Sequence, residues 1–577
     1  MSLTIANDVQ TVLSVAALGS DNVLTIANAS APFNNPPTPV VDSVLTIVDD
    51  KAAPSAVEII RYSAIADNGD GTSSITISER GSEGTTALDW PANSIVYQSV
   101  TAAILAALEQ VHASNVVASN LPSDGFVLSY NAGEFRWVDQ NTEAFDPNFV
   151  GTLSPLMWFD VKQETFVDSQ SVGSLADFGS HAVTLDQVTE SKKPVYTQSI
   201  DGLVFDHTAG SFLQTGGASP NIPLPYTVIL VADIRSKQIG QVLFDGEQSA
   251  NRAALGTSGS TSDDFSMWNG AVGAGLDWQP VGRKSVWVAE FQATQTKLFH
   301  NGVEIDGGAS GSNSFQGLSI GGRFSDERFM SMSLHELAVL GSALSIEDKV
   351  VTVRNLRDKW GIEKASITAF DPVHWYDLAQ ETLTDQQSIQ DWIDHGSAAV
   401  NLSAISDPQR PVYNQALNAL VFDHSAESFM RTASSPVLTQ PYTIILVGEI
   451  VSSINNQLIF DGEQSSNRAV FDSLSTGPDM WAGSLLTASG EPLAQPMAVW
   501  ALVYNGSHSK MYRGKTLLAE GFVGSQSSQG FSLAGRYNNA AGRFASINMR
   551  ELAKIPVALL PADVNEITDG LTAKWGL

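Results

Sequence analysis

The sequence contains no cysteine, which excludes disulfide bonds, thiolate metal ligands and a cysteine nucleophile. Basic residues are also scarce, because 31 lysines and arginines stand against 61 aspartates and glutamates, for a net charge of −30. We therefore expect no binding to nucleic acid or to an anionic membrane, since phosphate contacts need clustered lysine and arginine. Charged residues make up 16% of the 577 positions and hydrophobic residues 43%, enough for several buried cores.

Long hydrophobic runs are missing as well. No apolar stretch approaches the roughly 18 residues that suggest a membrane-spanning helix. The N-terminal segment Met1–Asp8 has neither a basic region nor a long apolar stretch, so we do not expect a signal peptide. A protein of this kind that acts outside a cell would leave it by another route, such as lysis.

What the sequence does contain is a long internal repeat. Residues 156–362 and 373–577 align block for block, and Phe244–Ala253 returns almost unchanged as Phe460–Ala469. Other matching pairs are Trp158–Asp160 with Trp375–Asp377, Leu203–His207 with Leu420–His424, and Lys359–Gly361 with Lys574–Gly576. A period of about 210 residues is a duplicated domain rather than a solenoid unit.

Each copy has the pattern of short strands followed by one helix. Tyr226–Val231 and Tyr442–Val447 are apolar runs suited to buried strands, and Asn301-Gly302 predicts a hairpin turn. Ser345 is a suitable N-cap for the first closing helix. The expected buried stripes are Ile346, Val350, Val353, Leu356 and Trp360 in the first copy, and Val564, Ile567, Leu571 and Trp575 in the second.

The order of these motifs resembles the concanavalin A-like, laminin-G-type jelly roll. The resemblance implies two tandem β-sandwich domains, 145–362 and 363–577, in a mainly β protein. Segments 139–155 and 363–372 are expected to be linkers. Such jelly rolls occur in lectins, adhesion proteins, virion fibres and accessory domains of enzymes, so the fold alone does not choose a function.

The front of the chain has a different pattern. Residues 1–100 predict short strands with turns between them, and Glu58–Arg61 is followed by Arg80–Ala87 and Trp90–Ala92. This order resembles the N-terminal virion-attachment domain of bacteriophage tail fibres, with Asn93 where glycine is usual. The alternative is a two-glycine turn in any small β-domain.

Residues 101–144 are expected to link the front domain to the repeats. Ile104, Leu108 and Val111 have the spacing of a short coiled-coil seam within Thr101–Ser114, which fits either a threefold bundle or a helix packed on the front domain. Residues 123–138 predict a hairpin and resemble an element of phage fibre shafts.

Two motifs in each copy are candidates for ligand binding. The first holds Asp245, Glu247, Asn251 and Arg252, repeated as Asp461, Glu463, Asn467 and Arg468. It fits a ligand or calcium loop, but a structural turn in which Arg252 pairs with an acid is the favoured interpretation, because the motif directly follows core strand residues. The second places Trp268 and Trp481 in loop-like regions, as a platform for sugar rings or as core packing.

Catalytic patterns are not found. Glu336 and Glu551 lie in strand-like segments without a second acid two residues on, so we expect solvent-facing acids rather than a glycosidase pair. The histidines lack metal-ligand spacing, and most are expected to be surface or capping residues. The aspartates of Asp67–Gly71 do not fit a calcium loop and predict a plain turn. We therefore predict no catalytic residue, no metal and no cofactor, with calcium unsupported by a motif.

Together, the two resemblances predict a bacteriophage tail fibre or similar appendage, made in the host cytoplasm and assembled into the virion. Residues 1–100 would contact tail or capsid proteins, the chain would associate with itself as a homotrimer, and the jelly rolls would bind a host-surface glycan. The alternatives are a capsid decoration fibre with a purely structural role, and a polysaccharide-degrading appendage enzyme.

Overall fold

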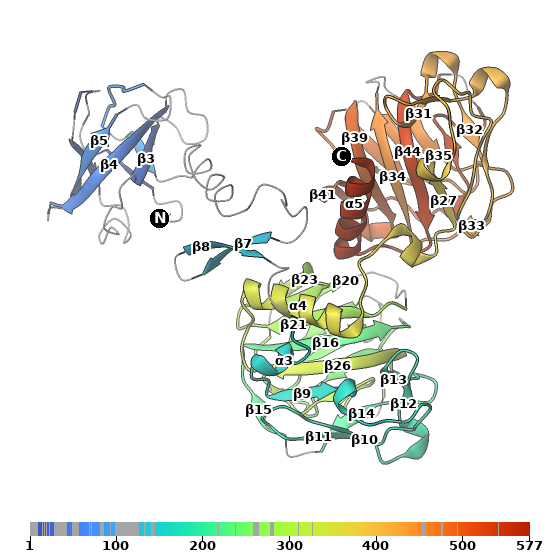
Figure 1. Ribbon diagram of the computed structural model, residues 1–577. Coiled ribbons are helices and arrows are strands. Elements are labelled where there is room, and N and C mark those ends of the chain that lie inside the picture. Colours follow the sequence, from blue (N-terminus) through green and yellow to red (C-terminus); the bar gives the residue numbers. More distant parts are fainter. Residues whose placement is uncertain are drawn as a thin grey trace. The chain divides into compact units, whose positions relative to one another are not determined.

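The computed structural model describes residues 10–13, 16, 18, 20–21, 23–27, 43–48, 57–68, 70, 72–80, 86–92, 94–97, 126–131 and 134–139. It also describes residues 145–577 except 217–218, 237, 258–264, 277–281, 310, 326, 452–455, 475–476, 493 and 540–541. The chain forms two compact units, residues 1–144 and 145–577 (Figure 1). The predicted fold class is confirmed, because the protein is mainly β with paired sheets and few helices. The domain boundaries stay predictions.

The first unit holds one six-stranded antiparallel sheet. Its strands, in spatial order, are β1 (Gln10–Val12), β6 (Ile95–Tyr97), β3 (Ser43–Val48), β4 (Val57–Asp67), β5 (Thr72–Glu79) and β2 (Val23–Ala27). The predicted hairpin is present as β7 (Phe126–Asn131) paired with β8 (Glu134–Asp139). The helix predicted at 101–114 lies outside the described residues.

A buried glutamate explains the motif at the front of the chain. Glu58 on β4 is 0% exposed. It accepts two hydrogen bonds from Arg80, at 2.6 and 2.8 Å, and one from the Trp90 indole at 2.7 Å. Burial alone would raise the pKa of Glu58, but the bonds from Arg80, the Leu88 backbone and Trp90 outweigh it and lower the pKa. Arg80 and Trp90 are thus structural residues of this domain.

The repeated modules are β-sandwiches. In the first, one sheet has the order β10 (Ser174–Ala176), β11 (Thr184–Asp186), β14 (Leu213–Thr215), β25 (Ser319–Ile320), β17 (Val242–Asp245), β18 (Ala254–Thr257), β19 (Phe265–Trp268) and β20 (Val272–Leu276). We call it the tryptophan sheet, because it carries Trp268. The facing helix-side sheet has the order β12 (Val195–Thr197), β13 (Gly202–Phe205), β26 (Met332–Leu340), β16 (Tyr226–Ile234), β21 (Ser285–Phe291), β22 (Gln295–His300) and β23 (Val303–Ala309), with β9 (Met157–Asp160) also on β26.

The second module repeats this topology. Its tryptophan sheet has the order β28 (Asp391–Trp392), β29 (Leu402–Ala404), β32 (Met430–Arg431), β43 (Ser532–Leu533), β35 (Gln457–Asp461), β36 (Val470–Leu474), β37 (Gly477–Trp481) and β38 (Leu485–Thr487). Its helix-side sheet has the order β30 (Val412–Asn414), β31 (Ala419–Phe422), β44 (Ile547–Ile555), β34 (Tyr442–Ile450), β39 (Gln495–Tyr504), β40 (Ser509–Arg513) and β41 (Thr516–Gly521), with β27 (His374–Asp377) on β44.

Short elements complete both modules. The two-stranded pairs are β15 (Asn221–Ile222) with β24 (Phe315–Gln316) and β33 (Val437–Leu438) with β42 (Ser528–Gln529). The helices are α3 (Phe149–Thr152), α4 (Ile346–Trp360) and α5 (Pro561–Trp575). The 3₁₀ turns are η1 (Val161–Gln163), η2 (Glu190–Lys192), η3 (Ile367–Phe370), η4 (Leu378–Gln380), η5 (Asp407–Gln409), η6 (His424–Ala426) and η7 (Gly506–His508).

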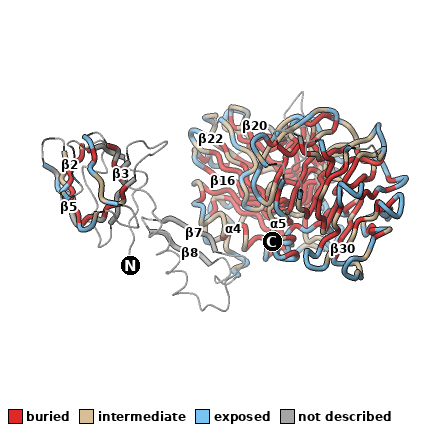
Figure 2. Tube along the Cα trace, turned by 90° about the horizontal axis from the view of Figure 1, so that it is seen from above, coloured by how far each residue is buried: buried red, intermediate tan, exposed pale blue. Residues whose placement is uncertain are grey.

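The helix-side sheet is covered on both faces. All nine residues of β16 are buried, and Figure 2 shows mostly buried strands within both modules. The reason is that the tryptophan sheet packs on one face while α4 or α5 lies across the other (Figure 1). A strand with two buried faces is apolar throughout rather than alternating, as Tyr226–Val231 predicted.

A buried glutamate binds the C-terminal end of each closing helix. Glu336 on β26, 2% exposed, accepts the indole N–H of Trp158 at 2.8 Å and that of Trp360 at 2.7 Å. Lys359 lies 2.8 Å from the same carboxylate and 2.6 Å from Asp160. The repeated motifs Trp158–Asp160 and Lys359–Gly361 therefore meet around Glu336 in one cluster, which joins β9, β26 and α4.

The second module repeats the cluster around Glu551 on β44, which is 1% exposed. Trp375 and Trp575 donate to it at 2.8 and 2.7 Å, and Lys574 lies 2.7 Å away. The prediction that Glu336 and Glu551 are solvent-facing was wrong. The pattern of polar and apolar residues along a strand cannot show that a helix covers the face on which its polar residues lie.

Of four other predictions, two are confirmed and two need correction. The hairpin turn at Asn301-Gly302 and the Ser345 cap, which accepts from the Asp348 N–H at 3.0 Å, are confirmed. Ile346 is 71% exposed, because it precedes the part of α4 that packs on the sheet. The predicted linkers are partly packed, since Val150, Ile367 and Phe370 are buried in the cores of their modules.

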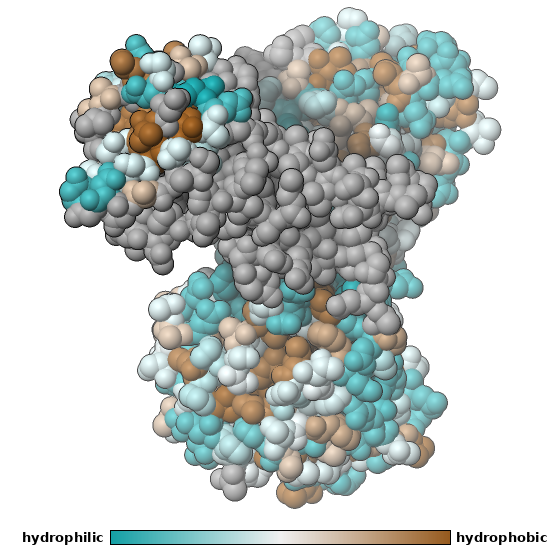
Figure 3. Space-filling model, turned by 60° about the vertical axis from the view of Figure 1, so that its left-hand side comes forward, coloured by the Kyte–Doolittle hydropathy of each residue, from teal (hydrophilic) through white to brown (hydrophobic). Residues whose placement is uncertain are grey.

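The described surface is mixed in polarity. On the face in Figure 3, hydrophilic residues surround smaller groups of hydrophobic ones, as is usual for the surface of a folded protein. None of the helices that the structure describes has the length and apolar character needed to cross a lipid bilayer.

Removing the charge of the buried glutamates tests their role. Glu336→Gln leaves Asp160 as the remaining carboxylate beside Lys359, whose side chain is 5% exposed, and places an amide N–H where Trp158 or Trp360 donates. It should destabilise the first module by about 3 kcal/mol. Glu551→Gln should cost less, about 1–3 kcal/mol, because the Lys574 side chain is 30% exposed. Hydrogen exchange, followed on peptides of α4 and α5 in the full chain, measures both.

Glu304→Gln is the matched control, because Glu304 pairs with Lys297 on the surface with 46% of its side chain exposed. Such pairs contribute about 0–1 kcal/mol. A control effect as large as that of Glu336→Gln would contradict the proposed role of the cluster.

Candidate functional site

The repeated acidic and basic motif forms a buried ion pair. Asp245, at the end of β17, is 0% exposed and accepts two hydrogen bonds from Arg252, at 2.7 and 2.8 Å. Burial raises the pKa of Asp245, and the neighbouring guanidinium opposes that rise. The bidentate contact fixes the plane of the Arg252 side chain.

The arginine brings the two sequence candidates together. The Arg252 guanidinium lies 4.8 Å from the centre of the Trp268 ring and 5.2 Å from that of Phe324, within the range of cation–π contacts. Phe265 and Met267, the alternate residues of β19, belong to the hydrophobic core, but Trp268 does not. Trp268 therefore lies on the outer face of the tryptophan sheet, where it is partly exposed.

The second module repeats this arrangement. Arg468 donates to Asp461 at 2.8 and 2.9 Å, and its guanidinium lies 5.0 Å from the centre of the Trp481 ring and 5.2 Å from that of Tyr537. We call these groups the tryptophan stacks: Asp245, Arg252, Trp268 and Phe324 in the first module, and Asp461, Arg468, Trp481 and Tyr537 in the second.

The remaining predicted residues do not join the stacks. The Asn251 and Asn467 amides donate to Gln316 and Gln529, at 2.9 and 3.3 Å. Glu463 turns inward and accepts a bond from the Thr432 hydroxyl at 2.7 Å. Glu247 lies beside Thr215, and burial raises its pKa to about 7. Ligand binding by any of these residues stays a prediction.

The two modules differ beside the stacks. In the second, Asp472 and Asp479 face each other on β36 and β37, where the first module has Gly256 opposite Ser266. Burial and the charge of Asp479 raise the pKa of Asp472 to about 7. Asp479 is 0% exposed, so its carboxylate is not presented to a substrate.

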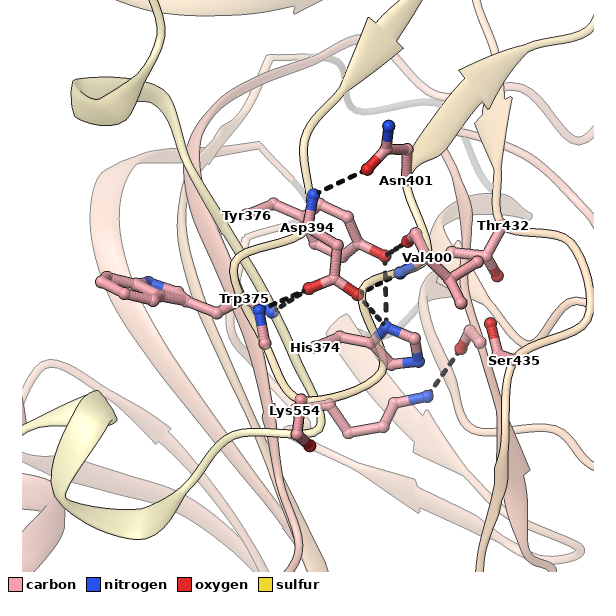
Figure 4. A network of polar contacts seen from close by, with 12 residues as sticks. His374, Trp375, Tyr376, Asp394, Val400, Asn401, Thr432, Ser435 and Lys554 are labelled. Carbon is pink, nitrogen blue, oxygen red and sulfur yellow. Dashed lines mark hydrogen bonds and ion pairs between the residues drawn. The ribbon is translucent and has the colours of Figure 1, made fainter.

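A second difference lies in the core. Met157, Phe159 and Val339 of the first module correspond to His374, Tyr376 and Lys554 in the second. The His374 ring bonds to Asp394 at 2.8 Å, with both side chains buried, and the Tyr376 hydroxyl donates to the Val400 carbonyl at 2.7 Å (Figure 4).

Lys554 completes this buried network. Its ammonium donates to the Ser528 hydroxyl at 2.7 Å and to the Gly530 carbonyl at 2.6 Å, and lies 4.1 Å from the centre of the Phe531 ring. Burial lowers the pKa of Lys554 to about 7, with Glu463 and Asp394 acting against it. Burial also lowers the pKa of His374, so the neutral ring is favoured.

Several of these residues were missed by sequence analysis. Phe324 and Tyr537 join the stacks from loops distant in sequence, which spacing cannot show. The network had a detectable signal, because aligning the two copies places polar side chains opposite apolar ones at three core positions. The prediction that most histidines lie at the surface was wrong for His300, His335 and His374, which are at most 3% exposed.

Within the described residues, no group of three or more histidine, aspartate or glutamate side chains is placed to hold a metal ion. The aspartates of the predicted turn serve that turn, since Asp70 accepts from the backbone and the hydroxyl of Thr72. The tryptophan stacks therefore offer a ligand an aromatic ring to pack against, next to a guanidinium that is held in a fixed position.

No protein-family model and no curated protein matches the chain. Similar solved structures include the Trypanosoma rangeli sialidase, 11% identical over 61% of this chain and 54% of that chain, with a TM-score of 0.28. This chain thus spans about half of the sialidase. Domain 4 of the extracellular arabinanase AbnA from Geobacillus stearothermophilus, in complex with arabinotriose, is 15% identical over 35% of this chain and 98% of that chain, with a TM-score of 0.26.

The binding domain of botulinum neurotoxin serotype D is 9% identical over 71% of this chain and 97% of that chain, with a TM-score of 0.29. At these TM-scores and identities the similarities carry no argument about this protein. Its β-sandwich architecture is established by the strand pairing described above.

The buried histidine predicts an acid-sensitive second module. Because the fold lowers the pKa of His374, the unfolded state takes up the proton first as pH falls below about 6.5. Stability is therefore lost progressively below that pH, until the folded ring is also protonated. Hydrogen exchange of second-module peptides at about pH 7.5 and pH 5.5 measures the loss.

His374→Met is the matched variant, because Met157 occupies this position in the first module. In this variant Asp394 still accepts hydrogen bonds from the backbone N–H groups of Trp375, Gly396 and Val400. Asp177 accepts the equivalent backbone hydrogen bonds in the first module, where Met157 takes the place of the histidine. The variant should lose less protection on acidification. An equal loss in both proteins would show that His374 does not set the acid sensitivity.

Proposed function

We propose that this protein is a fibre subunit of a bacteriophage virion, and that its two β-sandwich modules bind glycans on the host surface. The observation that carries the glycan-binding proposal is the duplicated tryptophan stack. Each module places a partly exposed tryptophan on the outer face of a sheet, against an arginine that a buried aspartate holds in place.

This geometry suits a sugar ring. The apolar C–H face of a pyranose packs on an indole, and the Trp268 and Trp481 side chains are both partly exposed. Because Asp245 and Asp461 already fix the arginines, little side-chain entropy remains to be lost on binding. The pre-ordered stack thus supports binding better than a mobile tryptophan would.

Duplication supports attachment to a surface. Two weak sites on one chain bind a repetitive polysaccharide with an avidity above that of either site, and a trimer would carry six. The resemblance of residues 1–100 to virion-attachment domains supports the placement on a particle, and the stretch 101–144 supports self-association.

Binding is favoured over polysaccharide cleavage by one observation. Hydrolysis needs two carboxylates that reach the same glycosidic bond. In the cross-strand acid pairs Asp472–Asp479, Asp160–Glu336 and Asp377–Glu551, at least one carboxylate is buried and so does not reach a substrate. A purely structural fibre would not require partly exposed tryptophans at matching positions in both copies.

A bacterial polysaccharide array probed with the labelled full chain tests glycan binding. Trp268→Ala and Trp481→Ala should each weaken binding to the recognised polysaccharide about tenfold, and the double variant should abolish it, since loss of aromatic stacking removes the main contact. Val188→Ala is the control, because Val188 is a more exposed hydrophobic residue, at 93%, and should change nothing. Unchanged binding by the double variant would refute the site.

The virion placement has its own test. An antibody against the full chain should label purified phage particles in electron micrographs, at a tail or capsid appendage, and light scattering should give three chains per assembly. Particles free of this protein would refute the virion proposal while leaving glycan binding open to the array.

A further inference from the structure

The second module contains a pocket apart from its tryptophan stack. The pocket has a volume of about 530 Å³, and its walls include Val400, Asn401, Ser403, Ile405, Arg431 and Thr432. In the sheet, β32 and β37 are separated by β43, β35 and β36. At roughly 4.8 Å per strand, Arg431 and Trp481 thus lie on strands about 19 Å apart, too far for one monosaccharide to contact both.

The buried network holds the walls of this pocket in place. The Val400 carbonyl accepts from Tyr376 at 2.7 Å, and the Val400 N–H donates to Asp394 at 2.9 Å. On the other wall, the Thr432 hydroxyl donates to Glu463 at 2.7 Å. The Tyr376 contact is specific to the second module, whereas Asp394, Glu463 and Thr432 correspond to Asp177, Glu247 and Thr215 of the first.

The walls offer donors for an anion. Asn401 uses its carbonyl oxygen to accept the Asp394 N–H at 3.1 Å, and Figure 4 shows its amide nitrogen pointing away from the network. Arg431 is exposed and donates to the Tyr537 carbonyl at 3.3 Å. No ion pair of Arg431 is found within the described part of the chain. The nearby Asp391 carboxylate accepts from Ser403 at 2.6 Å.

The first module provides the comparison. Ser403 pairs with Arg431 in register, and the equivalent pair in the first module is Asp186 with Gln214. An acid beside an amide thus becomes a hydroxyl beside a cation, while Ser174, which pairs with Asp186, becomes Asp391, which pairs with Ser403. These positions together change from one negative charge to a balanced pair of charges. In a chain of net charge −30, this change makes the second pocket locally more favourable for a negative group.

We propose that this pocket binds the carboxylate of an acidic sugar. Arg431 pairs with the carboxylate, the Asn401 amide donates to it or to a neighbouring hydroxyl, and Ile405, 44% exposed, packs against the apolar face of the ring. A guanidinium is the side chain best matched to a carboxylate, because it donates two parallel hydrogen bonds. Arg431 contacts the second tryptophan stack through the backbone carbonyl of Tyr537, but the proposed sugar contacts do not involve Trp481.

Saturation-transfer difference NMR of the full chain, with glucuronate, glucose and acetate as probes, tests the proposal. Glucuronate should bind, whereas glucose and acetate should bind about tenfold more weakly or not at all, because each lacks one of the two contacts. Arg431→Gln, which installs the residue found at position 214, should weaken glucuronate binding about tenfold. Arg431 is exposed, so the variant is expected to fold.

One further variant separates this site from the stacks. Trp481→Ala should leave glucuronate binding unchanged. Full glucuronate binding by Arg431→Gln, or equal binding of acetate, would overturn the proposal. Loss of glucuronate binding in Trp481→Ala would also overturn the proposal and would assign the ligand to the tryptophan stack. Failure of the pocket proposal can therefore be distinguished from failure of the glycan-binding proposal on the polysaccharide array.

Discussion

The interaction on which the architecture depends is a buried glutamate that accepts hydrogen bonds from tryptophan and pairs with a cation. Glu58, Glu336 and Glu551 each do this in their own domain. An isolated buried carboxylate is costly, and it is tolerated only when its oxygens are fully used. Here two or more donors bind each glutamate. Each carboxylate is therefore stable in the core only when the surrounding strands are arranged so that these donors reach it.

In the modules, this requirement decides which faces remain available. The cluster ties the closing helix to the outer face of the helix-side sheet, which is thereby removed from contact with ligands. Among the described residues, no helix lies across the outer face of the tryptophan sheet, where the tryptophan stacks and the second-module pocket are found. The position of the closing helix thus decides which sheet carries the candidate sites.

Much of this fold could be predicted because the chain is duplicated. The matching blocks identified the modules, the apolar runs identified β16 and β34, and Asn301-Gly302 identified a turn. The exposure of Glu336 could not be predicted, since its strand looks alternating until α4 is placed over it. For the candidate site, the sequence named Arg252 and Trp268 separately, but their contact arises from strand register, and Phe324 comes from a remote loop. The network of His374 and Lys554 is visible only when the copies are compared.

The differences between the copies suggest that they have separate roles on a shared scaffold. The central claim is that the outer face of the tryptophan sheet is the ligand face. A crystal structure of the full chain with the oligosaccharide that binds best tests this most directly. Our account predicts sugar density against Trp268 or Trp481, or in the pocket beside Arg431. Sugar bound only elsewhere, on the helix-covered side or on the front domain, would contradict it.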